Sequence, residues 1–167
     1  AMYRAVTLHA IRNKWIKDSA GFEGVKKNLI LKSLDSLEFE FIYNKNQSYQ
    51  IYLNKENVDK QIKSTLVAKY VSLISTFPEL RKKIVSIQQE MGENGGVVME
   101  GRDIGSVVFP SAELKLFITA SLEIRAQRRY KELLNMGIKT DLGKVLKNLE
   151  MRDFQDSNRK KSPLIKV

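Results

Sequence analysis

The sequence predicts an α/β fold in which buried parallel strands alternate with helices and a small antiparallel hairpin is inserted. In the second half of the chain, short apolar runs at 97–100 and 114–120 are flanked by segments with helical spacing, as in α/β layer architectures. Between Leu37 and Val58, apolar residues recur at every second position around the turn-rich stretch 44–48, which is typical of a half-buried hairpin.

The remaining elements of the first half are expected to be helices. Helical spacing of apolar residues predicts helices over 1–13 and over about 59–76. Pro78 stands where a first helical residue stands, and the helix that it begins should end at Gly92.

Two further helices are predicted near the end of the chain. Ser121 can cap a helix that runs through Asn135 and is ended by Gly137. The last helix should begin near Thr140 or Asp141 and should continue past Arg159 before Pro163 interrupts it.

Composition excludes several kinds of chemistry. A chain of 167 residues fits one domain, or one domain with a small insertion. It has no cysteine and one histidine, which rules out disulfides and thiolate sites and argues against hydrolytic triads and zinc chemistry. No apolar run approaches the roughly 18 residues that a membrane span needs. This composition suits a reducing cytoplasm.

The charge balance points to an anionic partner. The formal net charge is +10, and no arginine lies between Arg12 and Arg81. Scattered lysines mainly keep a surface soluble, whereas the guanidinium fork binds phosphate at two points. The uneven distribution of arginine therefore suggests a site for a phosphorylated ligand.

One candidate site is a glycine-flanked turn. Arg102 and Asp103 follow the predicted strand that ends at Glu100, and ligands of open α/β sheets bind beyond such strand ends. The alternative is that Arg102 and Asp103 form an ion pair that only stabilises the turn.

A second candidate lies on the last helix. Its apolar stripe, continued at 100° per residue, runs into Arg152, Asp153, Asp156 and Arg159. Inward-facing charges are costly unless they are paired or hold a ligand, so this stripe also suggests a binding cleft. The alternative is a frayed helix end with solvated charges.

A third group, Arg125, Arg128 and Arg129, shares one flank of a helix. Like charges at this spacing repel, and a polyanion bound over them would reverse that penalty. From this triplet alone, a solvated face is the favoured interpretation.

Five segments together resemble the bacterial cytidylate kinases in order and spacing: AMYR at 1–4, TFPELR at 76–81, EGRDIGSVVFP at 100–110, RAQRR at 125–129 and RDFQDSNR at 152–159. The resemblance implies a P-loop nucleoside monophosphate kinase-like parallel sheet with helices on both faces, incomplete here, plus a small antiparallel insertion. It implies a kinase core over 1–30 and 77–167, a lid at about 129–142, and a nucleotide-binding insertion over about 31–76.

The resemblance also implies an activity, which is ATP-dependent phosphorylation of CMP and dCMP, with Mg²⁺ entering on ATP and no dedicated metal ligands. The intact enzyme is expected to be a cytoplasmic monomer, without nucleic-acid or membrane partners. The substrate-binding residues implied are Arg4, Ser72, Arg81, Arg102, Asp103, Asp156 and Arg159. The residues implied to neutralise the moving phosphoryl group are Arg125, Arg129 and Arg152.

The sequence departs from this family in one respect. None of its nine glycines belongs to a G-x-x-x-x-G-K-S/T loop, whose backbone amides and lysine cradle the phosphates of ATP. We therefore expect a fragment that lacks sheet strands at both ends and does not turn over ATP alone. Its exposed sheet edge should make it poorly stable or prone to self-association.

Two other functions remain open at this point. A net charge of +10 also fits a basic nucleic-acid-binding module. Another nucleoside monophosphate kinase, or a shikimate-like kinase, would carry similar phosphate-binding arginines.

Overall fold

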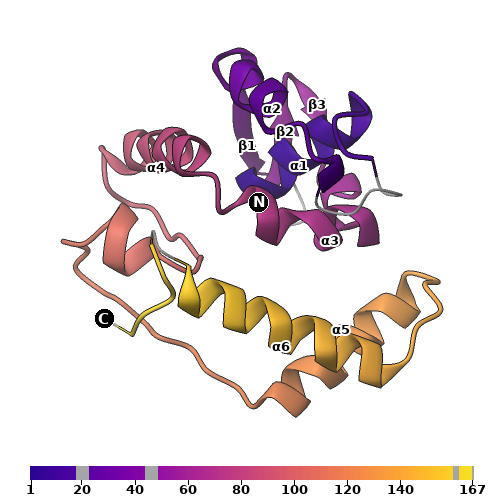
Figure 1. Ribbon diagram of the computed structural model, residues 1–167. Helices are drawn as coiled ribbons and strands as arrows, with labels where there is room; N and C mark the ends of the chain where they lie inside the picture. Colours follow the sequence, from indigo (N-terminus) through magenta and orange to yellow (C-terminus); the bar gives the residue numbers. More distant parts are fainter. Residues whose placement is uncertain (18–22, 44–48, 160–161, 167) are drawn as a thin grey trace. The chain divides into compact units, whose positions relative to one another are not determined.

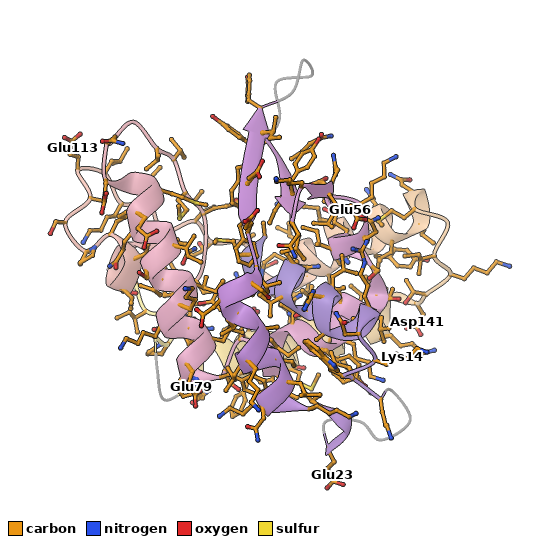
Figure 2. All side chains as sticks on the ribbon, turned by 90° about the horizontal axis from the view of Figure 1, so that it is seen from above. Lys14, Glu23, Glu56, Glu79, Glu113 and Asp141 are labelled. Carbon is orange, nitrogen blue, oxygen red and sulfur yellow. The ribbon has the colours of Figure 1, made fainter. Side chains whose placement is uncertain are left out.

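The computed structural model describes residues 1–17, 23–43, 49–159 and 162–166, which divide into two compact units, Ala1–Glu93 and Asn94–Val167. Figure 1 shows their helices and strands. Charged side chains such as Glu23, Glu79 and Glu113 are exposed (Figure 2). Among the described residues, the helices are too short or too polar to cross a membrane.

The first unit is built around helix α1 (Met2–Arg12), which packs against α3 (Thr65–Ile74). Met2, Val6 and Ala10 are buried, which confirms the apolar stripe predicted for this helix. Short helix α2 (Lys27–Ser33), the 3₁₀ turn η2 (Leu34–Ser36) and α4 (Pro78–Gly92) complete its helical part. The starting proline and the final glycine of α4 were both predicted.

An antiparallel sheet of three strands belongs to the same unit. Strands β1 (Phe39–Tyr43), β2 (Tyr49–Leu53) and β3 (Glu56–Asn57) lie in that order, with Phe41 opposite Ile51. Ile51 is buried, so one face of β2 joins the core, as the period-two pattern predicted. The predicted turn at 44–48 lies outside the described residues.

One helix of this unit begins later than predicted. The segment 59–76 contains a 3₁₀ turn, η3 (Gln61–Lys63), and α3 begins only at Thr65. The reason is local, because Ser64 is an N-cap whose hydroxyl accepts from the backbone N–H of Val67 at 3.4 Å.

The core of the first unit combines side chains from its helices and its sheet. The buried side chains of α1, α3 and α4 pack with those of the β2 strand and the α2 helix, and Trp15 packs against their edge. The inserted hairpin and the helices around it therefore share one apolar core.

The second unit consists of a π-helical turn, η4 (Ile104–Val108), and two longer helices, α5 (Leu122–Asn135) and α6 (Leu142–Asn158). The hydroxyl of Ser121 accepts from Ile124 N at 3.3 Å, and Gly137 has a φ of 74°, so the predicted cap and stop are both confirmed. Helices α5 and α6 pack through a small cluster, Ala126, Leu133 and Val145.

Two predictions for this unit are wrong in detail. The segments 97–100 and 114–120 are not strands, and Val98 and Ile118 are largely exposed. A parallel strand needs neighbours to satisfy its backbone, and within the described residues these segments pair with no other strand. Helix α6 ends at Asn158, because Arg159 is extended (φ −67°, ψ 141°), so the helix does not pass Arg159.

The shared core of the first unit predicts unequal costs for two identical truncations. Ile84→Ala removes a fully buried side chain from α4 and should lower the free energy of unfolding by about 2–5 kcal/mol. Ile42→Ala, on an exposed part of β1, should cost about 1 kcal/mol or less. Urea unfolding followed by fluorescence of Trp15, the single tryptophan, measures both. Equal losses would contradict the assigned core.

Candidate phosphate-binding site

The candidate site lies where the inward face of α6 changes from apolar to charged. Val145, Leu146 and Leu149 pack toward α5. Two turns on, Asp156 occupies the same side of the helix and is buried. The structure thus confirms the predicted ionic continuation of the stripe and rejects a frayed end with solvated charges.

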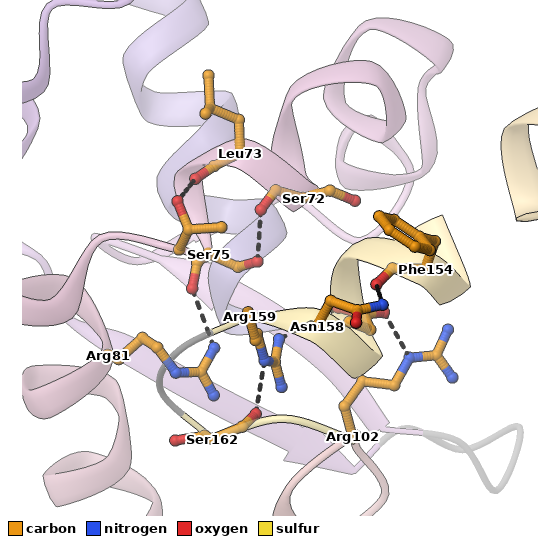
Figure 3. Close-up of polar contacts among 11 residues, drawn as sticks. Ser72, Leu73, Ser75, Arg81, Arg102, Phe154, Asn158, Arg159 and Ser162 are labelled. Atoms are coloured by element: carbon orange, nitrogen blue, oxygen red, sulfur yellow. Dashed lines mark hydrogen bonds and ion pairs between the residues drawn. The ribbon is translucent and has the colours of Figure 1, made fainter. Parts of the chain in front are cut away.

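Asp156 holds two arginines from opposite sides. Arg102 Nε donates to Asp156 Oδ2 at 3.0 Å, and Arg159 Nη1 donates to Asp156 Oδ1 at 3.1 Å. Arg159 Nε also donates to the carbonyl of Ser162 at 2.5 Å, a contact drawn in Figure 3. The Arg159 side chain is 8% exposed and that of Arg102 is 46% exposed, so Asp156 balances one buried and one accessible cation.

The turn that presents Arg102 is set by its neighbours. The backbone carbonyl of Asp103 accepts from Val107 N and Val108 N, which opens the π turn of η4, and Asp103 itself is buried. A Cβ on Gly101 would lie 2.8 Å from Ile104 Cγ1, so only glycine fits this close approach without a shift. Arg102 is thereby directed to Asp156 on α6.

The first turn of α5 supplies a second ion pair. Arg125 Nε donates to the carbonyl of Ala120 at 3.0 Å, and Arg125 Nη1 donates to Asp153 Oδ2 at 2.5 Å. Arg129 is paired with Glu132 at 3.1 Å. Arg128 is exposed. Of these three arginines, Arg125 therefore links α5 to α6, whereas Arg128 lies on a solvated face.

Arg152 lies among these charges and is mostly buried. Burial lowers the pKa of its guanidinium, and the nearby cations Arg102 and Arg129 lower it further, while Asp156 and Asp153 act in the opposite direction. Its buried Nε has no hydrogen-bond partner within the part of the chain that the structure describes. A buried donor of this kind is costly, and an anion that accepts from it would remove the cost.

The cluster as a whole has a surplus of positive charge. Its five arginines and three carboxylates are Arg102, Arg125, Arg129, Arg152, Arg159, Asp153, Asp156 and Glu132. The arrangement can bind an anion with several oxygens, such as a phosphate, by charge-assisted hydrogen bonds.

The first unit contains three predicted residues, of which Ser72 and Arg81 lie near the end of α3. Arg81 is buried, donates from Nη1 to the carbonyl of Ser75 at 3.0 Å, and stacks on the ring of Tyr3 at 5.3 Å. The hydroxyl of Ser75 donates to the carbonyl of Ser72, so these residues form one hydrogen-bonded group (Figure 3). Arg4 donates to the carbonyl of Ile62 at 3.0 Å.

The predicted site residues therefore fall into two groups. Arg4, Ser72 and Arg81 belong to the first unit. The second unit contains the other seven, and it brings six of them together around α6: Arg102, Arg125, Arg129, Arg152, Asp156 and Arg159. The seventh, Asp103, is buried in the turn next to Arg102. That all of them share one pocket stays a prediction.

The role of Asp153 and the backbone carbonyls that orient the arginines were not predicted from the sequence. Asp153 was noted on the ionic stripe but was given no role, although its place beside Arg152 was a usable signal. The backbone carbonyls that orient Arg4, Arg81, Arg125 and Arg159 leave no trace in side-chain patterns. Among the described residues, no group of three or more His, Cys, Asp or Glu side chains could hold a metal ion.

Comparison with known proteins gives a consistent result. The family model described as cytidylate kinase matches residues 1–167. A cytidylate kinase of Flavobacterium psychrophilum is 44% identical over all of this chain and 73% of its own length. One from Flavobacterium johnsoniae is 46% identical over 99% of this chain and 70% of its own length. One from Streptococcus pneumoniae is 43% identical over 98% of this chain and 70% of its own length.

The shared carboxylate of Asp156 predicts a large cost for its removal. Asp156→Ala leaves Arg159 buried without its counter-charge and should lower the free energy of unfolding by roughly 3 kcal/mol. Asp35→Ala removes an exposed carboxylate that pairs with Lys83 and should cost about 0.5 kcal/mol or less. Urea unfolding followed by circular dichroism compares the two. A cost for Asp156→Ala as small as the control would refute the bridging role.

Proposed function

The chain belongs to the cytidylate kinase family, and on that premise we propose that it carries the acceptor-binding and lid parts of an enzyme that phosphorylates CMP and dCMP with ATP. The observation that carries this proposal is the charge surplus around Arg152, whose buried Nε has no hydrogen-bond partner within the described residues. A phosphorylated ligand supplies the acceptors and the negative charge that this cluster lacks.

The reaction is a phosphoryl transfer. An α-phosphate oxygen of CMP forms a bond to the γ-phosphorus of ATP while the bond from that phosphorus to its bridging oxygen breaks, which leaves CDP and ADP. Such transfers need in-line placement and stabilisation of charge on the moving group rather than covalent help from the protein. We assign Arg125, Arg129 and Arg152 to that stabilisation, since they belong to the positively charged cluster of the second unit.

The acceptor phosphate is assigned to three other arginines. Arg102 and Arg159 are fixed by Asp156, so their geometry is prepared before a ligand arrives. Arg4 donates from Nη1 to the carbonyl of Ile62, a neutral acceptor that orients its guanidinium. Arg152 and Asp156 are also assigned to contact the ribose and the side of the site that faces the lid.

Cytosine recognition is assigned by chemistry. Asp103 is a buried carboxylate suited to accept from the 4-amino group of cytosine, which uracil lacks. On the first unit, Arg81 is suited to donate to the N3 and O2 acceptors, and Ser72 belongs to the same hydrogen-bonded group. Each good polar match of this kind gives about 1–3 kcal/mol of discrimination.

The donor set of this chain suits the phosphates of ATP better than it suits a bare ion. Its clustered cations are arginines, and the described residues offer no group of three or more metal-binding side chains. Magnesium would therefore be held largely by phosphate oxygens and water, as is usual for this ion.

The proposal extends to the fold. Most apolar side chains of the segments 97–100 and 114–120 are exposed. Exposure of this kind is expected of segments that would be strands of a parallel sheet once neighbouring elements cover them. The proposed kinase core covers 1–30 and 77–167, with the insertion over about 31–76. The proposed lid at about 129–142 includes the connection between α5 and α6 and the paired Arg129.

Turnover tests the function directly. The protein expressed from its complete open reading frame should form ADP from ATP in the presence of CMP or dCMP, and much more slowly with UMP or AMP. A coupled ADP assay at moderate salt measures these rates. A protein that instead binds RNA with a steep dependence on salt, and shows no preference for CMP, would support the nucleic-acid alternative.

The assignment of Asp103 predicts a change in specificity. In Asp103→Asn, an amide that carries its own N–H donors replaces the acceptor for the cytosine amino group, so CMP should bind about 10- to 100-fold more weakly while UMP is little affected. Titration calorimetry with CMP and UMP measures both affinities. Asp35→Asn, the same change at an exposed site, should leave them unaltered. An unchanged CMP preference in Asp103→Asn would refute this assignment.

A further inference from the structure

The contact between Arg125 and Asp153 joins the two helices of the second unit at their charged end. Its N–O distance is 2.5 Å, and the carbonyl of Ala120 accepts from the Nε of the same guanidinium at 3.0 Å. Two contacts on different edges fix the plane of the Arg125 fork as well as its position. Asp153 is therefore the charged one of the two acceptors that hold Arg125, and the carbonyl of Ala120 is the neutral one.

Asp153 and Asp156 divide the arginines between them. Asp156 binds Arg102 and Arg159, whereas Asp153 binds Arg125 and lies beside Arg152 in the sequence. The charge of Asp153 also raises the pKa of Arg152, against the effect of burial. One carboxylate thus serves two of the three arginines assigned to the moving phosphoryl group.

We infer that Asp153 is a positioning residue that acts on phosphoryl transfer through Arg125, an inference that rests on the proposed function. The side chains are 33% exposed for Arg125 and 29% for Asp153, so part of Arg125 can reach a ligand while its carboxylate anchor stays in place. Electrostatic stabilisation of a transition state depends on donors that are already oriented when charge develops. Asp153 supplies that orientation without itself contacting the substrate.

This role has a distinct kinetic signature. Asp153→Asn keeps an oxygen acceptor near Arg125 but removes one negative charge from a cationic site. The greater positive charge should leave the KM values for ATP and CMP equal or lower, while a poorly held Arg125 should lower kcat by about 10-fold. If Asp153 only moderated the charge, KM would fall with kcat preserved. If it only stabilised the helix pair, the unfolding temperature would fall with both constants preserved.

A double-mutant cycle shows whether Asp153 acts through Arg125. We expect Arg125→Gln to lower kcat by about 100-fold, and the double variant with Asp153→Asn to be no slower than Arg125→Gln alone. Independent action would instead multiply the losses to about 1000-fold. The cycle uses the protein expressed from its complete open reading frame, at a temperature below the unfolding transition of every variant.

Controls separate this inference from the proposed function. Asp35→Asn, the same substitution at an exposed carboxylate, should leave kcat within about twofold. Asp153→Ser repeats the test with a smaller polar side chain if Asp153→Asn is too unstable to assay. An active protein whose Asp153 variants keep full kcat, or whose losses multiply, overturns the inference alone. An unaltered protein that does not phosphorylate CMP overturns both.

Discussion

The carboxylate of Asp156 accepts from Arg102 on one oxygen and from Arg159 on the other, and the charged end of α6 depends on this sharing. Arg159 is almost fully buried, and a buried guanidinium is tolerated only when a counter-charge and hydrogen-bond acceptors replace its water. Asp156 supplies the charge and Ser162 supplies a further acceptor. Because Arg102 uses the second oxygen, the same carboxylate also directs a more accessible guanidinium that is available to a ligand.

The two kinds of acceptor around the arginines have different consequences. A carboxylate orients a guanidinium and cancels its charge, whereas a backbone carbonyl orients it and leaves the charge in place. Arg4 and Arg81 each have a carbonyl contact of this second kind, while Arg125 has one contact of each kind. A backbone carbonyl can therefore orient an arginine without itself cancelling the positive charge. The lowered pKa of Arg152 has another origin, since it comes first from burial and then from the nearby cations Arg102 and Arg129.

What the sequence predicts correctly here is mainly local. Ser121, Pro78 and the alternation along β2 act on neighbouring residues, and the structure confirms all three. Strand β1 pairs with β2 as predicted, but its side chains do not alternate between buried and exposed. The strands expected at 97–100 and 114–120 are absent, because pairing between strands is a long-range property that an apolar run does not contain. The site follows the same rule. Its residue types were visible in the ionic stripe, but the pairing of Arg102 with Asp156, 54 residues away, was not.

The cluster of arginines and carboxylates around α6 belongs to the second unit alone. Arg102 reaches α6 from the turn before η4, and Arg125 reaches it from α5, so the cluster needs only the packing of these elements and the ion pairs made by α6. The apolar contact between α5 and α6 is small, with Ala126, Leu133 and Val145 as its buried members. Ion pairs at the charged end therefore contribute more to the relative position of α5 and α6 than they would in a unit with a larger apolar core. Changes to Asp153 or Asp156 should thus affect the relative position of the two helices as well as the charge that they present.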